Sequence, residues 1–339
     1  MKILITGSTG FIGSHFIEQC LNRGWDVDAV KRNSSNLDIY ESVKRFYKQD
    51  SSHPSSGEIN QLQLLKEALS ERAEWSCLNY LSDKRGSLKW LTASLDDIDE
   101  VIGLMQNSYD LIIHAAAKIS FKKKDGAQMI EDNIHLTRNI INAAIKENQK
   151  KIIHVSSIAA LGRPSEDRPI QITDDWEETP YNTDYAKSKF HSEMEVWRGK
   201  EEGMNVLIVN PGIVLGYAQG PNSSRQVIEA ATKGNPFIPA GSNGFVFVED
   251  LVSRTLELSE NESSWNQRYL MVSHNLDYEY LLNTIAKVYH TVPPKWKLNG
   301  TFFKLILAAV KLLEKVGIQP NISSELLIST HKKSVYQNA

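Results

Sequence analysis

The feature that most constrains the fold lies at the start of the chain, where a short apolar strand runs into a turn with evenly spaced glycines. The run Lys-Ile-Leu-Ile-Thr is followed by Gly7, Gly10 and Gly13. A helix over about 12–23 should come next and end at Gly24 in a left-handed cap. Glycines at these positions let the backbone approach a pyrophosphate, and the free N–H groups of the helix N-terminus bind its charge. The sequence therefore predicts a dinucleotide site formed by Gly7, Thr9, Gly10, Phe11, Ile12 and Gly13.

Strand and helix patterns alternate through most of the chain, which predicts a parallel sheet with right-handed crossovers. The further strands are expected at residues 26–32, 88–91, 109–113, 151–156 and 205–210. The predicted fold class is α/β, a Rossmann-type doubly wound parallel sheet with a smaller C-terminal lobe that binds the substrate. We place the dinucleotide-binding domain at residues 1–210 and the lobe mainly at 211–339, with 246–264 returning to the Rossmann core.

An insertion between about residues 33 and 86 interrupts the alternation. It combines a polar loop over 51–57 with an amphipathic helical stretch over 58–75, in which Leu62, Leu65 and Leu69 share one side. We expect this insertion to lie at the edge of the sheet. It either covers a partner surface, shapes the mouth of the cofactor site, or is a surface decoration without such a role.

The end of the second strand decides between the two nicotinamide dinucleotides. A carboxylate there would bond the ribose 2′-hydroxyl of NAD, whereas an arginine would accommodate the 2′-phosphate of NADP. This chain has Lys31 and Arg32, followed by Asn33 and Ser34, and no acid before Asp38. Two cations beside hydroxyl and amide donors suit a phosphate. We therefore expect NADP as the cofactor, with NAD as the alternative and solvated surface charges as the other interpretation of the two cations.

Tyr185 and Lys189 are the first candidates for chemistry, because residues four apart stack on one face of a helix. An ammonium beneath a phenol favours the phenolate. The spacing alone is common, and it gains weight from the dinucleotide turn and from Ser157, whose hydroxyl can hold a substrate oxygen. Ser156 is the alternative to Ser157, since sequence cannot decide which hydroxyl faces the site.

The chain resembles the extended short-chain dehydrogenase/reductase superfamily over about 330 residues. Its motifs occur in order: the glycine turn, His114–Ala117, Asn133 with Thr137, Val155–Ser157, Tyr185–Lys189 and Asn210–Gly216. The sequences of the motifs at 155–162 and 210–216 are most similar to those of dihydroflavonol-reductase-like and 3β-hydroxysteroid-dehydrogenase-like members.

The resemblance implies a role for each matching residue. Tyr185 would be the general acid/base with a pKa lowered toward neutrality, Lys189 would also bond the nicotinamide ribose, and Ser157 would orient the substrate oxygen. Asn133 would support the lysine through water. The remaining cofactor contacts would come from Lys31, Arg32, Ser94, Leu95, Ala115, Ala116, Ala117, Lys189, Pro211, Gly212 and Val214.

Two departures from the superfamily narrow the function. Ala93-Ser94-Leu95 stands where relatives often have Gly-Asp-Leu near the adenine. Ile158 and Ala159 stand where sugar-nucleotide dehydratases carry an Asp-Glu pair, so the acid and base needed to expel water are missing. We expect an NADP-dependent oxidoreductase that interconverts a carbonyl and an alcohol on a small organic substrate. A sugar-nucleotide epimerase using NAD and a non-catalytic nucleotide-sensing protein are the alternatives.

Composition bears on partners and location. The formal net charge of −3 gives no sign of a nucleic-acid partner, and no ligand spacing indicates a metal site. No signal peptide opens the sequence, so we expect a cytoplasmic protein. The apolar run 302–318 contains Lys304, Lys311, Glu314 and Lys315, which excludes stable insertion across a membrane. We expect this run to form a helix that is buried or faces a second copy of the chain in a homodimer. A helix on a membrane surface is the less favoured alternative.

Overall fold

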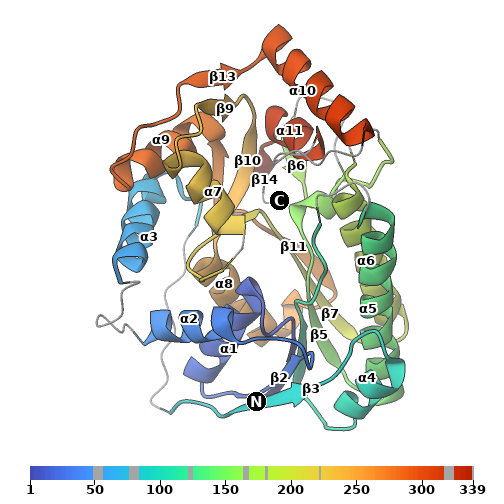
Figure 1. Cartoon of the computed structure of the whole chain (residues 1–339). Coiled ribbons are helices and arrows are strands. Elements are labelled where there is room, and N and C mark those ends of the chain that lie inside the picture. Colours follow the sequence, from blue (N-terminus) through green and yellow to red (C-terminus); the bar gives the residue numbers. More distant parts are fainter. Residues whose placement is uncertain are drawn as a thin grey trace.

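The computed structural model describes residues 1–48, 56–75, 84–120, 125–162, 168–179, 182–220, 223–316 and 324–337. At its centre is a seven-stranded sheet in the order β11-β7-β5-β4-β1-β2-β3, and every neighbouring pair in it is parallel. The strands are β1 (Lys2–Thr6), β2 (Asp26–Lys31), β3 (Leu88–Thr92), β4 (Leu111–His114), β5 (Lys151–Val155), β7 (Asn205–Pro211) and β11 (Gln267–Met271). This arrangement confirms the predicted Rossmann-type parallel sheet (Figure 1).

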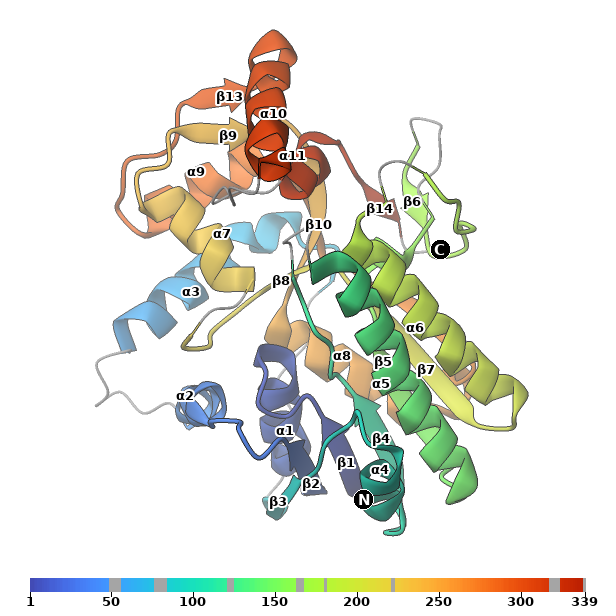
Figure 2. The same ribbon diagram turned by 45° about the vertical axis from the view of Figure 1, so that its right-hand side comes forward.

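Helices cover both faces of the sheet because its central strands β1, β4, β5 and β7 are buried on both sides. One face carries α1 (Phe11–Asn22) and α8 (Val248–Glu260), and the other carries α4 (Ile98–Met105), α5 (Gly126–Lys146) and α6 (Asp184–Glu201) (Figure 2). Gly24 has a φ of +78°, which is the left-handed helix end predicted after α1. The sheet thereby has two separate apolar cores, one on each side.

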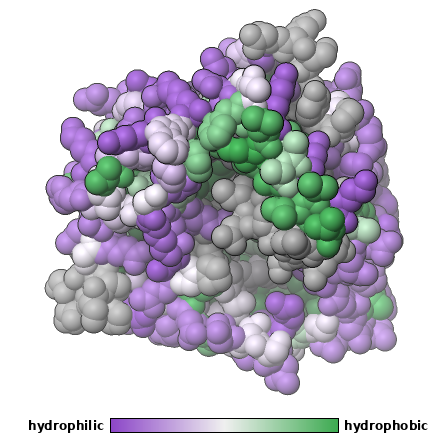
Figure 3. Space-filling view, turned by 45° about the horizontal axis from the view of Figure 1, so that its top comes forward, coloured by the Kyte–Doolittle hydropathy of each residue, from purple (hydrophilic) through white to green (hydrophobic). Residues whose placement is uncertain are grey.

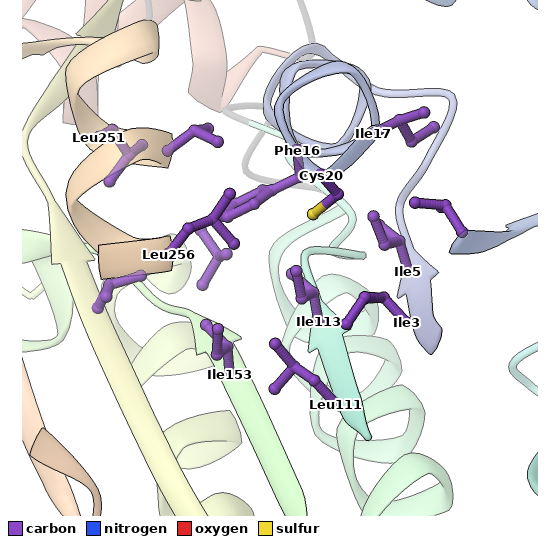
Figure 4. Close-up of a cluster of buried hydrophobic side chains, with 14 of the residues drawn as sticks. Ile3, Ile5, Phe16, Ile17, Cys20, Leu111, Ile113, Ile153, Leu251 and Leu256 are labelled. Carbon is purple, nitrogen blue, oxygen red and sulfur yellow. The ribbon is translucent and has the colours of Figure 1, made fainter. Parts of the chain in front are cut away.

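The helix α8 lies on the sheet although it follows strands of the lobe in the sequence. Leu251 and Leu256 of α8 meet Phe16 and Cys20 of α1 above Ile113 of the sheet (Figure 4). All of these side chains are fully buried. Two helices that lie far apart in the sequence therefore share one core.

The insertion after β2 contributes the helices α2 (Asp38–Tyr47) and α3 (Ser56–Leu69) and a short 3₁₀ turn at Ser70–Arg72. Most of the polar loop expected at 51–57 lies outside the described residues. Leu62, Leu65 and Leu69 do share one side of α3, and they are buried against lobe residues that include Phe245 and Leu281. The expectation of a sheet-edge position or a surface decoration is therefore wrong for α3, which is part of the lobe's apolar core.

In its described residues the lobe combines short strands with helices, some of which pack beside α3. Its strands form a three-stranded sheet and two pairs: β12-β10-β8, β13-β9 and β14-β6. The strands are β6 (Ile170–Gln171), β8 (Ile213–Leu215), β9 (Phe237–Pro239), β10 (Ser242–Phe247), β12 (His274–Asp277), β13 (Trp296–Leu298) and β14 (Tyr336–Gln337). The helices are α7 (Ser223–Thr232), α9 (Tyr278–Val288), α10 (Gly300–Lys315) and α11 (Ser324–His331).

The run 302–318 does form a helix, α10, at the outer end of the lobe (Figure 1). Phe303 is its one buried residue, so the expectation of a helix buried within the chain is wrong. In the described part of the chain, every helix is too short or too polar to cross a bilayer.

Candidate active site

Two glycines of the turn after β1, Gly7 and Gly13, stand where the neighbouring backbone leaves no room for a Cβ. Gly7 has a φ of +71°, and a Cβ built on it would lie 2.6 Å from the backbone of Ala115 and Ala116. A Cβ on Gly13 would lie 2.1 Å from the carbonyl oxygen of Gly7. The turn, the start of α1 and the loop after β4 are thereby pressed together at the carboxyl ends of β1 and β4.

The N-terminus of α1 is open to an anion. Gly10 is its N-cap, no side chain caps it, and its first turn contains no acidic residue. Thr9 belongs to the turn before this cap, and Phe11 and Ile12 are the first residues of the helix. Free N–H groups at a helix end that carries the positive end of the dipole are suited to a pyrophosphate. The residues present therefore fit the dinucleotide that the sequence predicts.

A cavity of about 360 Å³ lies beyond the ends of β2 and β3. It is lined by Arg32, Asn33, Ser34, Thr92, Ala93, Ser94 and Glu100. The Glu100 carboxylate accepts a hydrogen bond from the Ser94 N–H at 2.7 Å, so its charge is partly engaged by the loop. Of the expected adenosine-side residues, Arg32 and Ser94 line this cavity, whereas Lys31 and Leu95 do not.

The predicted catalytic residues come together where β5 ends and α6 begins. The side chains of Ser157 and Tyr185 are hydrogen-bonded to each other. The Lys189 ammonium, one helical turn after Tyr185, is buried and donates to the carbonyl oxygen of Val155 at 3.0 Å. Ser157 also accepts from the Ala159 N–H at 3.1 Å, which fixes its side chain at the start of a 3₁₀ turn.

The electrostatics of this group differ from the expectation of a lowered tyrosine pKa. Burial raises the pKa of Tyr185 above its usual value, and the hydrogen bond from Ser157 offsets this only in part. Burial also lowers the pKa of Lys189 to about 8, while the nearby charge of Glu193 acts in the opposite direction. In this structure Tyr185 is therefore held as a neutral phenol, which is the form that donates a proton.

Ser156, the alternative to Ser157, faces away from Tyr185 into a buried polar cluster. Its hydroxyl donates to the Glu193 carboxylate at 2.8 Å, and the Asn210 amide donates to the same oxygen at 3.1 Å. Arg268 pairs with the other oxygen of Glu193 at 3.3 Å. Glu193 is fully buried. Sequence reasoning missed this residue, although its position four residues after Lys189 places it on the same face of α6.

Asn133 fixes the loop after β4. Its side-chain oxygen accepts from the Lys118 N–H at 2.7 Å, and its amide donates to the Lys118 carbonyl at 2.9 Å and to Ser188 at 3.2 Å. This position links the loop of Ala115, Ala116 and Ala117 to α6. Support of Lys189 through water stays a prediction.

His114 is a structural residue at the end of β4. It is buried and is hydrogen-bonded to Thr6 at 2.8 Å and to Thr137 at 3.2 Å. Burial, with the nearby charge of Lys189, lowers its pKa to about 3. A neutral imidazole whose two ring nitrogens are both hydrogen-bonded cannot act as a general acid.

Pro211, Gly212 and Val214 lie at the carboxyl end of β7 and the start of β8, beside the end of β5. A Cβ on Gly212 would lie 2.4 Å from the Gly244 carbonyl oxygen, so the residue before β8 lies close against β10, the parallel neighbour of β8. The glycine turn, Arg32, the loop of Ala115 to Ala117 and Ser157 thus follow the carboxyl ends of strands in one parallel sheet, which is where open α/β sheets bind ligands. Across the described residues, no group of three or more His, Cys, Asp or Glu side chains is arranged to hold a metal ion.

Comparison with known proteins agrees with this geometry. The model of the NAD dependent epimerase/dehydratase family matches residues 3–270. The chain belongs to this family. It is accordingly an NAD(P)-dependent enzyme of the oxidoreductase type, as the extended short-chain dehydrogenase/reductase motifs predicted.

Similar proteins include reductases that act on different substrates. A dTDP-4-dehydro-6-deoxy-D-allose reductase of Streptomyces sp. is 27% identical over 273 residues, covering 76% of this chain and 72% of the relative. A dihydroflavonol 4-reductase-like protein of Synechocystis sp. is 22% identical over 329 residues, covering 94% and 81%. The crystal structure of gox2253 superposes with a TM-score of 0.71 at 23% identity, covering 99% of this chain and 89% of that one. The predicted resemblance to dihydroflavonol-reductase-like members of the family is confirmed.

Proposed function

We propose that this member of the epimerase/dehydratase family is an NADP-dependent reductase that converts a carbonyl group of a small organic substrate to an alcohol, and runs the reverse reaction when the alcohol is supplied. The observation that carries the proposal is the hydrogen-bonded pair of Ser157 and Tyr185, with the buried Lys189 one helical turn further along α6 and its ammonium held by the Val155 carbonyl at the end of β5. Reduction needs a proton donor for the oxygen that becomes a hydroxyl, and a neutral Tyr185 supplies that proton.

Each residue of the pair has a separate role in this proposal. Ser157 donates a hydrogen bond that orients the substrate oxygen, and Tyr185 transfers a proton to that oxygen. The positive charge of Lys189 then stabilises the tyrosinate that remains after proton transfer. Lys189 carries this charge only while its amine is protonated. The nicotinamide supplies the hydride. Glu193 is a positioning residue, because it acts on the site through Ser156 and Lys189.

Arg32 supports NADP as the cofactor. It lines the cavity beyond β2 with the hydroxyl and amide groups of Ser34, Ser94 and Asn33, all of which bond phosphate oxygens well. Glu100, the one acid in that lining, is engaged by the Ser94 N–H. An Arg32→Glu variant should lose affinity for NADPH and keep or gain affinity for NADH, measured by cofactor fluorescence titration.

Turnover tests the proposal. The purified protein is screened for NADPH oxidation with aldehydes, ketones and sugar nucleotides, alongside Tyr185→Phe and the control Tyr280→Phe, which changes a tyrosine on α9. We expect net NADPH consumption that Tyr185→Phe abolishes and Tyr280→Phe retains. Co-purified NAD and isomerisation of a sugar nucleotide without net redox change would favour the epimerase instead. Cofactor binding without any turnover would favour a nucleotide sensor.

We propose that residues 1–210 hold the cofactor and that 211–339, apart from 246–264, form most of the lobe that selects the substrate. We also propose a cytoplasmic location. A homodimer is compatible with this activity, and light scattering of the purified protein tests it.

A further inference from the structure

The helix α10 at the outer end of the lobe presents three distinct faces. One face packs on the lobe, where Phe303 is buried with Leu298 and Leu327, and Ile306 and Val310 lie against them. These positions fall on one side of a helix with 3.6 residues per turn. The lobe therefore uses only about a third of the helix circumference.

A second face of α10 is apolar and exposed. Leu305, Leu312 and Val316 recur at spacings of seven and four, and their exposed fractions are 64%, 62% and 62%. Phe302 and Leu313 border them at 44% and 37%. Hydrophobic side chains gather on this side of the molecule (Figure 3). A stripe of this kind along a single helix is more than the scattered exposed leucines of an ordinary surface.

An aromatic group extends the stripe beyond the start of α10. Trp296 of β13 is 61% exposed, and its ring centroid lies 5.9 Å from that of Phe237. The centroid of Phe237 lies 5.9 Å from that of Phe302. Tryptophan has an apolar ring and a polar N–H, a combination that favours the boundary between lipid and water.

The third face of α10 carries lysines. Lys304, Lys311 and Lys315 also recur at spacings of seven and four, and all are exposed. The spacing places them in one row beside the apolar stripe. The only acid of the helix, Glu314, accepts hydrogen bonds from the backbone N–H and the hydroxyl of Ser324 at 2.8 and 2.7 Å. The helix is thus locally basic on a chain whose formal net charge is −3.

We propose that α10, together with Trp296, is a docking surface for a lipid bilayer that carries anionic headgroups. The helix would lie in the plane of the bilayer, with the apolar stripe among the acyl chains and the lysine row at the phosphates. A second copy of the chain fits less well, because an identical helix would bring a second lysine row and no acidic row to pair with it. This surface is separate from the proposed active site, so the inference does not depend on the reductase activity.

Vesicle co-sedimentation tests the docking surface on the full chain. Vesicles of phosphatidylcholine alone are compared with vesicles of phosphatidylcholine and phosphatidylglycerol. Leu305→Ser with Leu312→Ser removes the centre of the stripe, and Leu64→Ser on α3, where the leucine is 52% exposed, is the matched control. Lys304→Gln, Lys311→Gln and Lys315→Gln together remove the charge row. The triple control Lys89→Gln, Lys150→Gln and Lys287→Gln makes the same charge change elsewhere.

We expect the wild type and both controls to sediment with the anionic vesicles and to stay in solution with phosphatidylcholine alone. The triple lysine variant should bind roughly a hundred-fold more weakly, because each lysine near an anionic surface contributes about fivefold. The double leucine variant should bind at least about tenfold more weakly. Circular dichroism confirms that each variant is folded.

Two results would overturn the inference. One is a wild-type protein that stays in solution with both kinds of vesicle. The other is binding that the stripe and lysine variants lose no more than their controls do. A dimer in light scattering that Leu305→Ser with Leu312→Ser converts to a monomer, without any vesicle binding, would assign the surface to self-association instead.

Discussion

Replacing glycines one at a time tests whether backbone contact at the turn after β1, rather than glycine flexibility in general, holds the cofactor site. In Gly13→Ala the new Cβ would lie 2.1 Å from the Gly7 carbonyl oxygen and 2.7 Å from its carbon. Both are backbone atoms, and the same oxygen accepts the Gly10 N–H at 2.9 Å. Real Cβ atoms stay beyond 3.0 Å of such an atom, so α1 and the turn must separate by about 0.9 Å.

The magnitude follows from the size of this clash. Overpacking costs up to about 3 kcal/mol, and a clash between backbone atoms belongs at the upper end of that range. An entropy of unfolding of about 2.1 cal/mol/K per residue gives about 0.7 kcal/mol/K for 339 residues. Gly13→Ala should therefore lower the melting temperature by about 4 °C, measured by differential scanning fluorimetry without cofactor.

Two other glycines of the described chain serve as matched controls. A Cβ on Gly10 would lie 3.2 Å from the Gly7 oxygen, which small movements relieve, so Gly10→Ala should melt close to the wild type. It should nevertheless bind NADPH at least about tenfold more weakly, equivalent to about 1.4 kcal/mol, because its Cβ stands where the pyrophosphate approaches. Gly103→Ala on α4 meets nothing within 4 Å and should raise the melting temperature by about 1 °C through helix propensity.

The melting temperatures of the three variants distinguish backbone contact from glycine flexibility in general. Equal melting of Gly13→Ala and the wild type would refute the argument from contact distances. So would a loss of stability in Gly103→Ala as large as that in Gly13→Ala.

Three further predictions concern buried groups. The folded pKa of Lys189 is about 8 against an ordinary 10.5, so between those values the folded protein has released a proton that the unfolded chain still binds. In urea unfolding, the free energy of unfolding of the wild type should therefore rise relative to that of Lys189→Met from about pH 8 to about pH 10.5. If the two free energies change in parallel over this pH range, the ammonium is not buried. Glu193→Gln should cost about 3 kcal/mol in the same assay because its arginine partner loses its counter-charge, whereas Glu201→Gln on the exposed side of α6 should be neutral. Leu65→Ala should cost about 2–5 kcal/mol by leaving a cavity between α3 and the lobe, and the exposed Leu64→Ala should cost little; equal losses would show that α3 is not packed there.

The strand, glycine turn and first helix could be predicted from sequence because local rules determine all three. Apolar alternation, the glycine spacing and the Gly24 cap each act within a few residues. The parallel character of the central sheet followed from the alternation of strands and helices along the chain, whereas the order of its strands was not predicted. Ser157, Tyr185 and Lys189 were found for a similar reason, since helical spacing and strand ends bring them together.

Contacts between distant segments could not be predicted. The packing of α3 against the lobe depends on Phe245 and Leu281, which lie about two hundred residues further along the chain. Glu193 was missed because its partners Ser156, Asn210 and Arg268 are placed around it only by three strands of the folded sheet. The sequence pattern of α10 showed a helix with an apolar side, but periodicity does not tell whether that side meets the protein or its surroundings.

The position of α8 has a consequence for how the chain folds. Phe16 packs with Leu256, and the last strand of the sheet, β11, is not complete until Met271, so the core under α1 needs residues from Ile3 to Met271. Such contacts between distant residues slow folding, because long loops must close before the contacts form. During synthesis, α1 would leave the ribosome long before the helix that shares its core. Its apolar side would stay uncovered over that interval, so we expect newly made chains to be more prone to aggregation than the finished protein.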